Sequence, residues 1–399
     1  MATNSPASIL LRNARIVLAE ETIDPANVLI DSGRIGDILS LTQPLPSASS
    51  TFDLGGMTLF PGFIDVHIHG AAGVDTMQAS AEDLQQVSAF LARNGITGWL
   101  PTLVPDSRNQ YQRATKAIDD LMSKQASGSS GLEARALGVH YEGPFVNDQQ
   151  CGALHREHFR TFQHDDDLNL IPRLKASAAN HMMTVAPEIA GGVKLIAELT
   201  KQRWIVSIGH TRATGEVLAQ ARSAGARHMT HFMNAMAPLH HRAPGPVDWG
   251  LMNDDVTCDV IADGIHLEPS ILKLILRNKT SQRVSLISDA IAAAGRGDGE
   301  YEIWGETITV QNGRTQNAQG SIAGSVITML DAVRLMLSLG FSEPEVAQMS
   351  STNPARLLRI DHDCGSIKAG QRADLVAFDD QRQVRLTVIG GQVAFQDLS

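Results

Sequence analysis

Eight short apolar runs in the middle of the chain constrain the fold more than any other feature of this sequence. Helical patterns separate most of them, and near-continuous apolar strands alternating with helices indicate a parallel sheet covered on both faces. Eight such units in about 250 residues predict the α/β class and a (β/α)8 barrel. The runs are 63–67, 97–102, 135–141, 182–186, 204–209, 227–231, 257–261 and 283–288.

The intervening helices and the two ends of the chain complete this prediction. Both ends read as short strands with turns, so we expect them to meet in one small β-sandwich domain made from residues 1–60 and 360–399. The barrel would then span 61–359. The expected helices are 81–94, 107–124, 193–202, 214–224 and 270–277, and the expected terminal strands are 9–18, 28–30, 374–378, 384–389 and 392–395.

Composition and charge exclude several classes of partner. Of the 399 residues, 43% are hydrophobic and 19% charged, which is ordinary for a globular protein. The net charge of −10 argues against nucleic acid or an anionic membrane as partner, and no apolar run is long enough to span a bilayer. Three scattered cysteines favour a reducing compartment over a disulfide framework. With no signal-peptide pattern at the N-terminus, a cytoplasmic location is expected.

Potential metal ligands follow five of the apolar runs. The carboxyl ends of barrel strands form the active-site face, so these side chains should converge there. His67 and His69 alternate along a strand and can point to the same side. A lone histidine is more often a packed core residue and a lone aspartate a helix cap, but five strand ends together favour a zinc-type or iron-type site. The residues concerned are His67, His69, Glu142, His210, His231 and Asp289.

The order HxH, Glu, His, His, Asp resembles the amidohydrolase superfamily, whose members hydrolyse amides, esters and amines in a (β/α)8 barrel. MTLFPGFIDVHIHG (57–70) is similar to the opening strand of that superfamily, and GSIKAGQRADLVAF (365–378) to its return into the small sheet domain. Many members take a carboxylated lysine from the fourth strand, but HMMTVAPE (181–188) ends without one. Glu142 is the available substitute.

A narrower resemblance rests on six motifs spread over nearly the whole chain. YEGPF (141–145), GHT (209–211), THFMNAM (230–236), DGIH (263–266), SDA (288–290) and SIAGS (321–325) together resemble the N-acetylglucosamine-6-phosphate deacetylase family. The resemblance implies metal-dependent hydrolysis of N-acetyl-D-glucosamine 6-phosphate to D-glucosamine 6-phosphate and acetate. It also implies a small anionic sugar phosphate as partner and a homodimer, because the family's phosphate arginine reaches a neighbouring subunit.

The same resemblance implies a role for individual residues. Glu142, His210 and His231 match the ligands of one divalent metal, Zn²⁺ or Fe²⁺, and the retained His67 and His69 allow a second. Asp289 matches the catalytic aspartate and His155 the histidine that handles the acetamido group. The matching substrate-binding positions are Ala153, Asn234, Ala235, Arg242, His266, Ile322, Ala323 and Gly324.

Two departures from the family pattern leave the substrate open. Tyr141 stands where an aliphatic residue is common, and Ala243 replaces the usual acidic residue after the phosphate arginine, beside His240 and His241. A related N-acyl substrate, such as N-acetylgalactosamine 6-phosphate or an N-acyl amino acid, is the alternative. A non-catalytic ligand-binding relative would be expected to lack a ligand or the strand-eight aspartate, and this chain has both.

The chemistry expected of such a site follows from the stability of an amide. A divalent metal lowers the pKa of a bound water towards about 7, which makes hydroxide available. Asp289 could take the proton of that water and deliver it to the leaving amine, and His155 could help to stabilise the oxyanion.

Overall fold

The eight predicted runs form the eight strands of a parallel barrel in the computed structural model, which describes residues 8–128 and 132–398. Each strand lies beside the next along the chain, in the order β6, β9, β11, β12, β13, β14, β15 and β16, with the short β10 also beside β9. The bounds are β6 Phe63–Ile68, β9 Ile96–Leu103, β10 Arg135–Ala136, β11 Gly138–Glu142, β12 Asn180–Val185, β13 Ile205–Ile208, β14 His228–Met229, β15 Thr257–Ile261 and β16 Val284–Ile287.

Backbone contacts between the first and last strands bring the barrel close to closure. Ile68 at the end of β6 forms a parallel bridge with Ala290, just beyond β16. The Asp289 N–H donates to the His67 carbonyl at 2.9 Å. These contacts bring the carboxyl ends of β6 and β16 together, which matters for the site described below.

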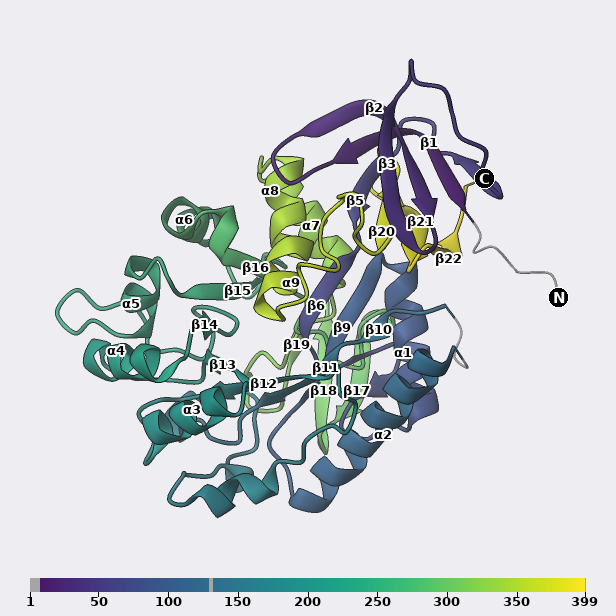
Figure 1. The fold of residues 1–399 in the computed structure, drawn as a ribbon. Coiled ribbons are helices and arrows are strands. Elements are labelled where there is room, and N and C mark those ends of the chain that lie inside the picture. The colour runs from purple at the N-terminus through teal and green to yellow at the C-terminus, as the bar shows by residue number, and fades with distance from the viewer. Residues whose placement is uncertain (1–7, 129–131, 399) are drawn as a thin grey trace.

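Helices cover the outside of the barrel, as Figure 1 shows. In α1, Ser80 caps the first turn together with Asp83, and the apolar stripe of Leu84, Val87 and Leu91 is buried. All five predicted helices are present, with small shifts at their ends. The bounds are α1 Ala81–Arg93, α2 Arg108–Ser127, α3 Gly192–Lys201, α4 Gly215–Ala224, α5 Pro246–Met252, α6 Pro269–Lys279, α7 Met329–Ser338, α8 Glu343–Ala347 and α9 Asn353–Leu357.

A second, mixed sheet joins the two ends of the chain. Its central contact is the antiparallel pair β5–β20, which places the purple N-terminal strands of Figure 1 beside the yellow C-terminal ones. The sheet has its own apolar core. The domain bounds 1–60, 61–359 and 360–399 remain a prediction. The strands are β1 Ile9–Val17, β2 Thr22–Asp31, β3 Arg34–Ser40, β4 Ser50–Asp53, β5 Thr58–Pro61, β20 Leu375–Phe378, β21 Val384–Ile389 and β22 Gln392–Gln396.

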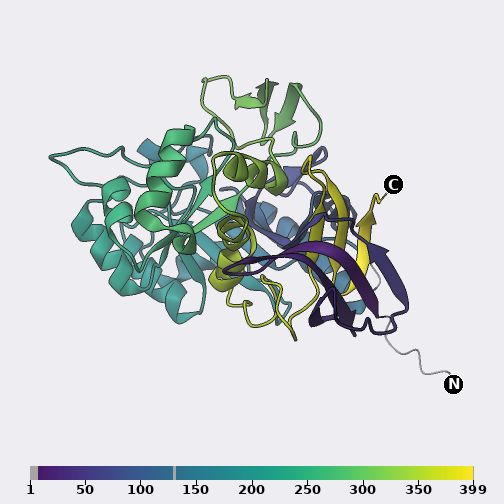
Figure 2. The ribbon, with the colours of Figure 1, turned by 90° about the horizontal axis from the view of Figure 1, so that it is seen from above.

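A small antiparallel sheet follows the last barrel strand and did not emerge from the sequence patterns. It contains β17 Gly299–Ile303, β18 Glu306–Gln311 and β19 Arg314–Gln316, and Figure 2 shows it standing apart from the terminal sheet. A separate apolar cluster, which includes Ile303, Ile308 and Ala323, holds it against the segment after β16. A two-stranded ladder, β7 Gly70–Ala71 with β8 Val74–Asp75, follows β6. None of the helices in the described part of the chain has the length and apolar character needed to cross a membrane.

Candidate metal centre and active site

Four histidines and one glutamate meet at the carboxyl ends of the barrel strands. The His67 and His69 Nε2 atoms lie 3.1 Å apart, so the alternation along β6 does aim both rings at one point. Glu142 Oε1 lies 2.9 Å from Nε2 of both His210 and His231, whose own Nε2 atoms are 3.1 Å apart. All five side chains are buried.

The spacing of these donor atoms fits a divalent metal ion. Two groups, His67–His69–Glu142 and Glu142–His210–His231, each bring three potential ligand atoms within 4.8 Å of one another. With zinc–nitrogen bonds of about 2.0–2.1 Å, tetrahedral ligands lie about 3.3 Å apart. The observed distances of 2.9 to 3.6 Å between donors of the same group are close to that spacing. Glu142 belongs to both groups and could bridge two ions.

The electrostatics of the cluster also call for a cation. Burial opposes the ionisation of Glu142, but the nearby His67, His210 and His231 outweigh it and hold the glutamate pKa well below its usual range. Burial would lower the pKa of His69, yet hydrogen bonds to Asp289 and Glu142 raise that pKa to about 10. His231 has a pKa raised to about 9, because Glu142 again outweighs burial. The carboxylates therefore attract positive charge, which a bound metal would supply.

Asp289 lies next to the HxH pair. Its Oδ1 is 3.2 Å from Nε2 of His69 and 3.4 Å from Nε2 of His67. Burial would raise the pKa of Asp289, but the two histidines outweigh it and keep that pKa below the usual value. Asp289 thus has the carboxylate form that a proton acceptor needs.

The backbone turns sharply at three of the strand ends. His210, His231 and Asp289 have φ values of 47°, 31° and 51°, in the left-handed region that non-glycine residues seldom adopt. Such strain persists where the surrounding structure over-determines it, and it is common at functional sites. The turns also explain why the observed strand β14 is shorter than the predicted run 227–231.

Hydrogen bonds beneath the ligands fix their orientation. The Asp259 carboxylate accepts the His231 backbone N–H and lies 2.9 Å from Nε2 of His228. The His210 Nδ1 lies 2.7 Å from the Gln150 carbonyl. Because a carbonyl can only accept, Nδ1 carries the proton in that bond and Nε2 keeps its lone pair for a metal.

A cavity of about 290 Å³ opens above the cluster. Four of the potential metal ligands line it, together with Asp289. These four are His69, Glu142, His210 and His231. Six of the residues that the resemblance assigns to substrate binding line it as well. They are Ala153, Asn234, Ala235, His266, Ile322 and Gly324.

Four other predicted site residues do not line the cavity. His67 is fully buried behind His69, and Ala323 is buried in the core of the β17–β19 sheet. Arg242 lies on an exposed loop. His155 has its Nε2 atom 3.6 Å from Glu306 Oε1, beside the cavity residues Ala153 and Leu154. The roles of these residues stay predictions.

The cavity also has walls that the sequence did not predict. Trp304 comes from the β17–β18 turn, and its ring meets the His69 ring edge-on with centroids 5.2 Å apart. Ser321, Gly152, Leu154 and Ile261 complete the lining. Only Gly305 of this turn is a typical hairpin residue, and tryptophan at the position before it is not a turn signal.

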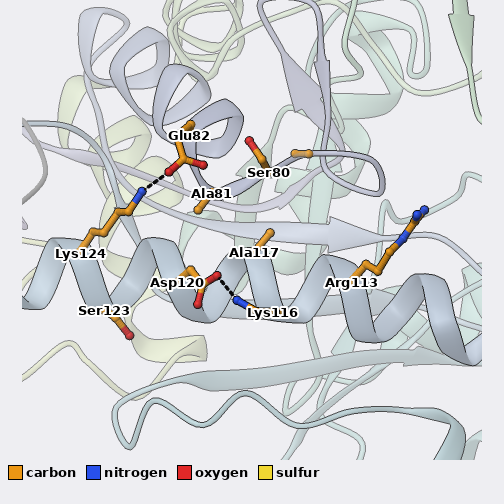
Figure 3. A pocket seen from close by; sticks show the side chains of 10 residues that line it. Ser80, Ala81, Glu82, Arg113, Lys116, Ala117, Asp120, Ser123 and Lys124 are labelled. Atoms are coloured by element: carbon orange, nitrogen blue, oxygen red, sulfur yellow. Dashed lines mark hydrogen bonds and ion pairs between the residues drawn. The ribbon is translucent and has the colours of Figure 1, made fainter.

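A second hollow, of about 530 Å³, lies between α1 and α2 and contrasts with this cavity. Figure 3 shows four of its charged side chains in two ion pairs, Lys116 with Asp120 and Lys124 with Glu82. These groups are largely exposed, and solvated pairs of this kind are weak. We therefore interpret this hollow as a solvated groove on the surface.

The barrel and the buried ligand cluster at its mouth define a metal-dependent hydrolase. Residues 58–394 match the amidohydrolase family. The chain belongs to the amidohydrolase family, so its fold and its class of chemistry agree with the resemblance drawn from the motifs.

Three relatives illustrate how closely this chain follows particular members. The N-acetylglucosamine-6-phosphate deacetylase of Bacillus subtilis is 35% identical over 391 residues, 97% of each chain. The N-acetylgalactosamine-6-phosphate deacetylase of Escherichia coli O157:H7 is 34% identical over 389 residues, 96% of this chain and 99% of that protein. A variant of the Mycobacterium smegmatis N-acetyl-D-glucosamine-6-phosphate deacetylase, solved with N-acetyl-D-glucosamine-6-phosphate, has a TM-score of 0.86 at 29% identity, covering 98% and 100% of the two chains.

Proposed function

We propose that this protein hydrolyses the acetamide of N-acetyl-D-glucosamine 6-phosphate to give D-glucosamine 6-phosphate and acetate. The observation that carries the proposal is the shared Glu142 between two sets of buried histidines, with Asp289 beside them in the same cavity. Full-length similarity to enzymes named for this reaction supports the choice of substrate.

The residues of the cluster would hold a divalent metal, Zn²⁺ or Fe²⁺. Glu142, His210 and His231 are suited to one ion, and His67 and His69 with Glu142 to a second. A divalent cation supplies Lewis acidity when bound, which lowers the pKa of a water towards about 7 and polarises an amide carbonyl.

Asp289 would move the proton. A carboxylate in its buried position can accept a proton from the attacking water and deliver it to the leaving amine nitrogen. His155, whose Nε2 lies 3.6 Å from Glu306 Oε1 beside the cavity, would stabilise the amide oxygen as charge develops.

The substrate's sugar phosphate would lie towards the ends of β14 and β15. Asn234 and Ala235 follow β14, and His266 follows β15 with its Nδ1 2.7 Å from Asp263 Oδ2. Ala153, Ile322, Ala323 and Gly324 would shape the remaining contacts. Arg242 is exposed in the single chain, which suits a role in the site of a second subunit and hence a homodimer.

A metal analysis separates one bound ion from two. We expect His67→Asn to lose the second ion while the Glu142–His210–His231 site retains its own. A wild-type protein that never exceeds one ion per chain when metal is plentiful would exclude the second site. The location of the enzyme, which we propose is the cytoplasm, requires fractionation of the source cells.

The second candidate is N-acetylgalactosamine 6-phosphate, because a relative at 34% identity is named for that substrate. The test is a deacetylation assay on phosphorylated and unphosphorylated N-acetyl hexosamines of both epimers, with and without chelator. We expect the highest kcat/KM with N-acetyl-D-glucosamine 6-phosphate and no activity after chelation. A preference for the galacto epimer, or for an N-acyl amino acid, would overturn the proposed substrate.

The phosphate-reading role of Arg242 has its own test. We expect Arg242→Ala to lower kcat/KM about 10- to 150-fold for the 6-phosphate sugar and hardly at all for the unphosphorylated sugar, since a charged hydrogen bond contributes about 1.5–3 kcal/mol. An equal loss of kcat/KM for both substrates would show that Arg242 does not recognise the phosphate. Sedimentation of the wild type would test the homodimer.

A further inference from the structure

Trp304 occupies a backbone position that ordinary turn chemistry does not explain. Ile303 and Glu306 pair across the β17–β18 hairpin, so Trp304 and Gly305 form its two-residue loop. Both have positive φ, at 55° and 78°. Such loops favour asparagine, aspartate or glycine at the first position, and a bulky residue with positive φ is an outlier.

The side chain of Trp304 accounts for this unusual choice. The indole lines the active-site cavity and packs edge-on against His69, one of the potential metal ligands. It also packs against the main barrel core and against the apolar cluster that seats the β17–β19 sheet, which includes Ile303 and Ile308. The β17–β19 sheet thus has a buried apolar core of its own, which can hold the Trp304 ring rigidly over the histidines of the site.

Trp304 and the sugar-side residues stand on different walls of the cavity. Asn234 and Ala235 follow β14, and His266 follows β15, whereas Trp304 reaches the mouth over the end of β6. An amide has two substituents, the carbon of its acyl group and the carbon attached to its nitrogen. If the sugar is directed towards β14 and β15, the acyl substituent is directed towards the remaining wall.

We propose that Trp304 is the specificity-determining residue that limits the acyl group to acetyl. This inference rests on the proposed deacetylase function. The flat, half-buried indole beside His69 would contact the acetyl methyl and leave no room for further carbons. A pocket that excludes one methylene typically discriminates by about 10- to 200-fold in kcat/KM.

The test compares N-acetyl-, N-propionyl- and N-butanoyl-D-glucosamine 6-phosphate as substrates. We expect Trp304→Ala to raise the propionyl-to-acetyl ratio of kcat/KM by about 10- to 200-fold, and Trp304→Phe to raise it less. Tyr301→Ala is the matched control, because Tyr301 packs on the same small cluster but does not line the cavity. Its ratio should equal that of the wild type.

Two further measurements keep the result interpretable. The metal content and circular dichroism of each variant show whether His69 and the fold persist. Inhibition by acetate and butanoate reports on acyl-side binding without turnover, and butanoate should gain on acetate in Trp304→Ala. An unchanged ratio in both Trp304 variants, or an equal loss with all three substrates, would overturn the inference. A wild type inactive on every N-acylglucosamine 6-phosphate would instead overturn the proposed function.

Discussion

Two layers of buried histidines lie in the barrel, and they differ in how their nitrogens are satisfied. In the lower layer, His140 bonds to the Val66 carbonyl and the Thr184 hydroxyl, at 3.1 and 2.8 Å. His228 likewise bonds to Thr257 and Asp259, at 2.7 and 2.9 Å. Each ring there has a partner for both nitrogens.

In the upper layer, the Nε2 atoms of His67, His69, His210 and His231 point at one another and at the carboxylates. The Nδ1 atoms of His67, His69 and His231 are buried without a hydrogen-bond partner among the described residues. The difference separates packing from potential ligation: the ring nitrogens of the lower layer bond to groups of the barrel wall, while Nε2 atoms that converge on one another prepare a site for a cation.

The largest expected effect comes from neutralising Glu142, the potential ligand that both groups of histidines share. We expect Glu142→Gln to abolish turnover and lower metal content, because Glu142 serves both groups of histidines. Deacetylation rates and elemental analysis measure the two effects. Glu82→Gln, in the exposed groove between α1 and α2, is the control and should change neither. A Glu142→Gln variant that keeps full activity without bound metal would contradict the proposed metal centre.

The next largest effect should come from Asp289, which lies beside the upper layer and which we propose carries the proton. We expect Asp289→Asn to lower turnover by at least about 10²-fold, as for a positioned acid–base group. Asparagine keeps the size of the side chain but does not readily accept a proton, so the fold and the metal content should persist. Near-normal turnover in this variant would make Asp289 structural.

Asp259 links the two layers, and its replacement should have an intermediate effect. It accepts the His231 backbone N–H and contacts His228, so Asp259→Asn should cost about 10- to 100-fold in metal affinity or activity, the usual range for groups that orient a ligand. Metal titration and urea unfolding would measure it. No change in either quantity would show that the lower layer acts independently of the site.

The smallest expected effect on the site concerns His181, a buried histidine outside both layers. Burial, assisted by the charge of Arg173, lowers its pKa to about 4, and its Nε2 accepts the Leu174 N–H at 2.9 Å. The unfolded chain binds a proton below about pH 6.5 and the folded protein does not. The free energy of unfolding should therefore decrease as the pH is lowered from 6.5 to 4, by up to about 1.4 kcal/mol per pH unit. His181→Gln should flatten that slope in urea unfolding measured against pH.

Much of this architecture could be predicted because it depends on local patterns. Apolar runs such as 182–186 and the capped helix that begins at Ala81 reflect side-chain periodicity and hydrogen bonding within a few residues. The ligand set followed from one topological rule, that strand carboxyl ends meet at one face. The β17–β19 sheet escaped this reasoning because its strands are short and half-exposed, so they carry little apolar signal.

By itself, the sequence determined the barrel, the meeting of the two chain ends and the set of potential ligands, because these depend on periodicity and chain order. Only the tertiary structure decided that Glu142 is shared by both sets of histidines and that Trp304 stands over His69. It also decided that Arg242 lies outside the cavity of its own chain. Those facts depend on distances between residues far apart in the chain, which side-chain packing and backbone strain fix and which no local pattern encodes.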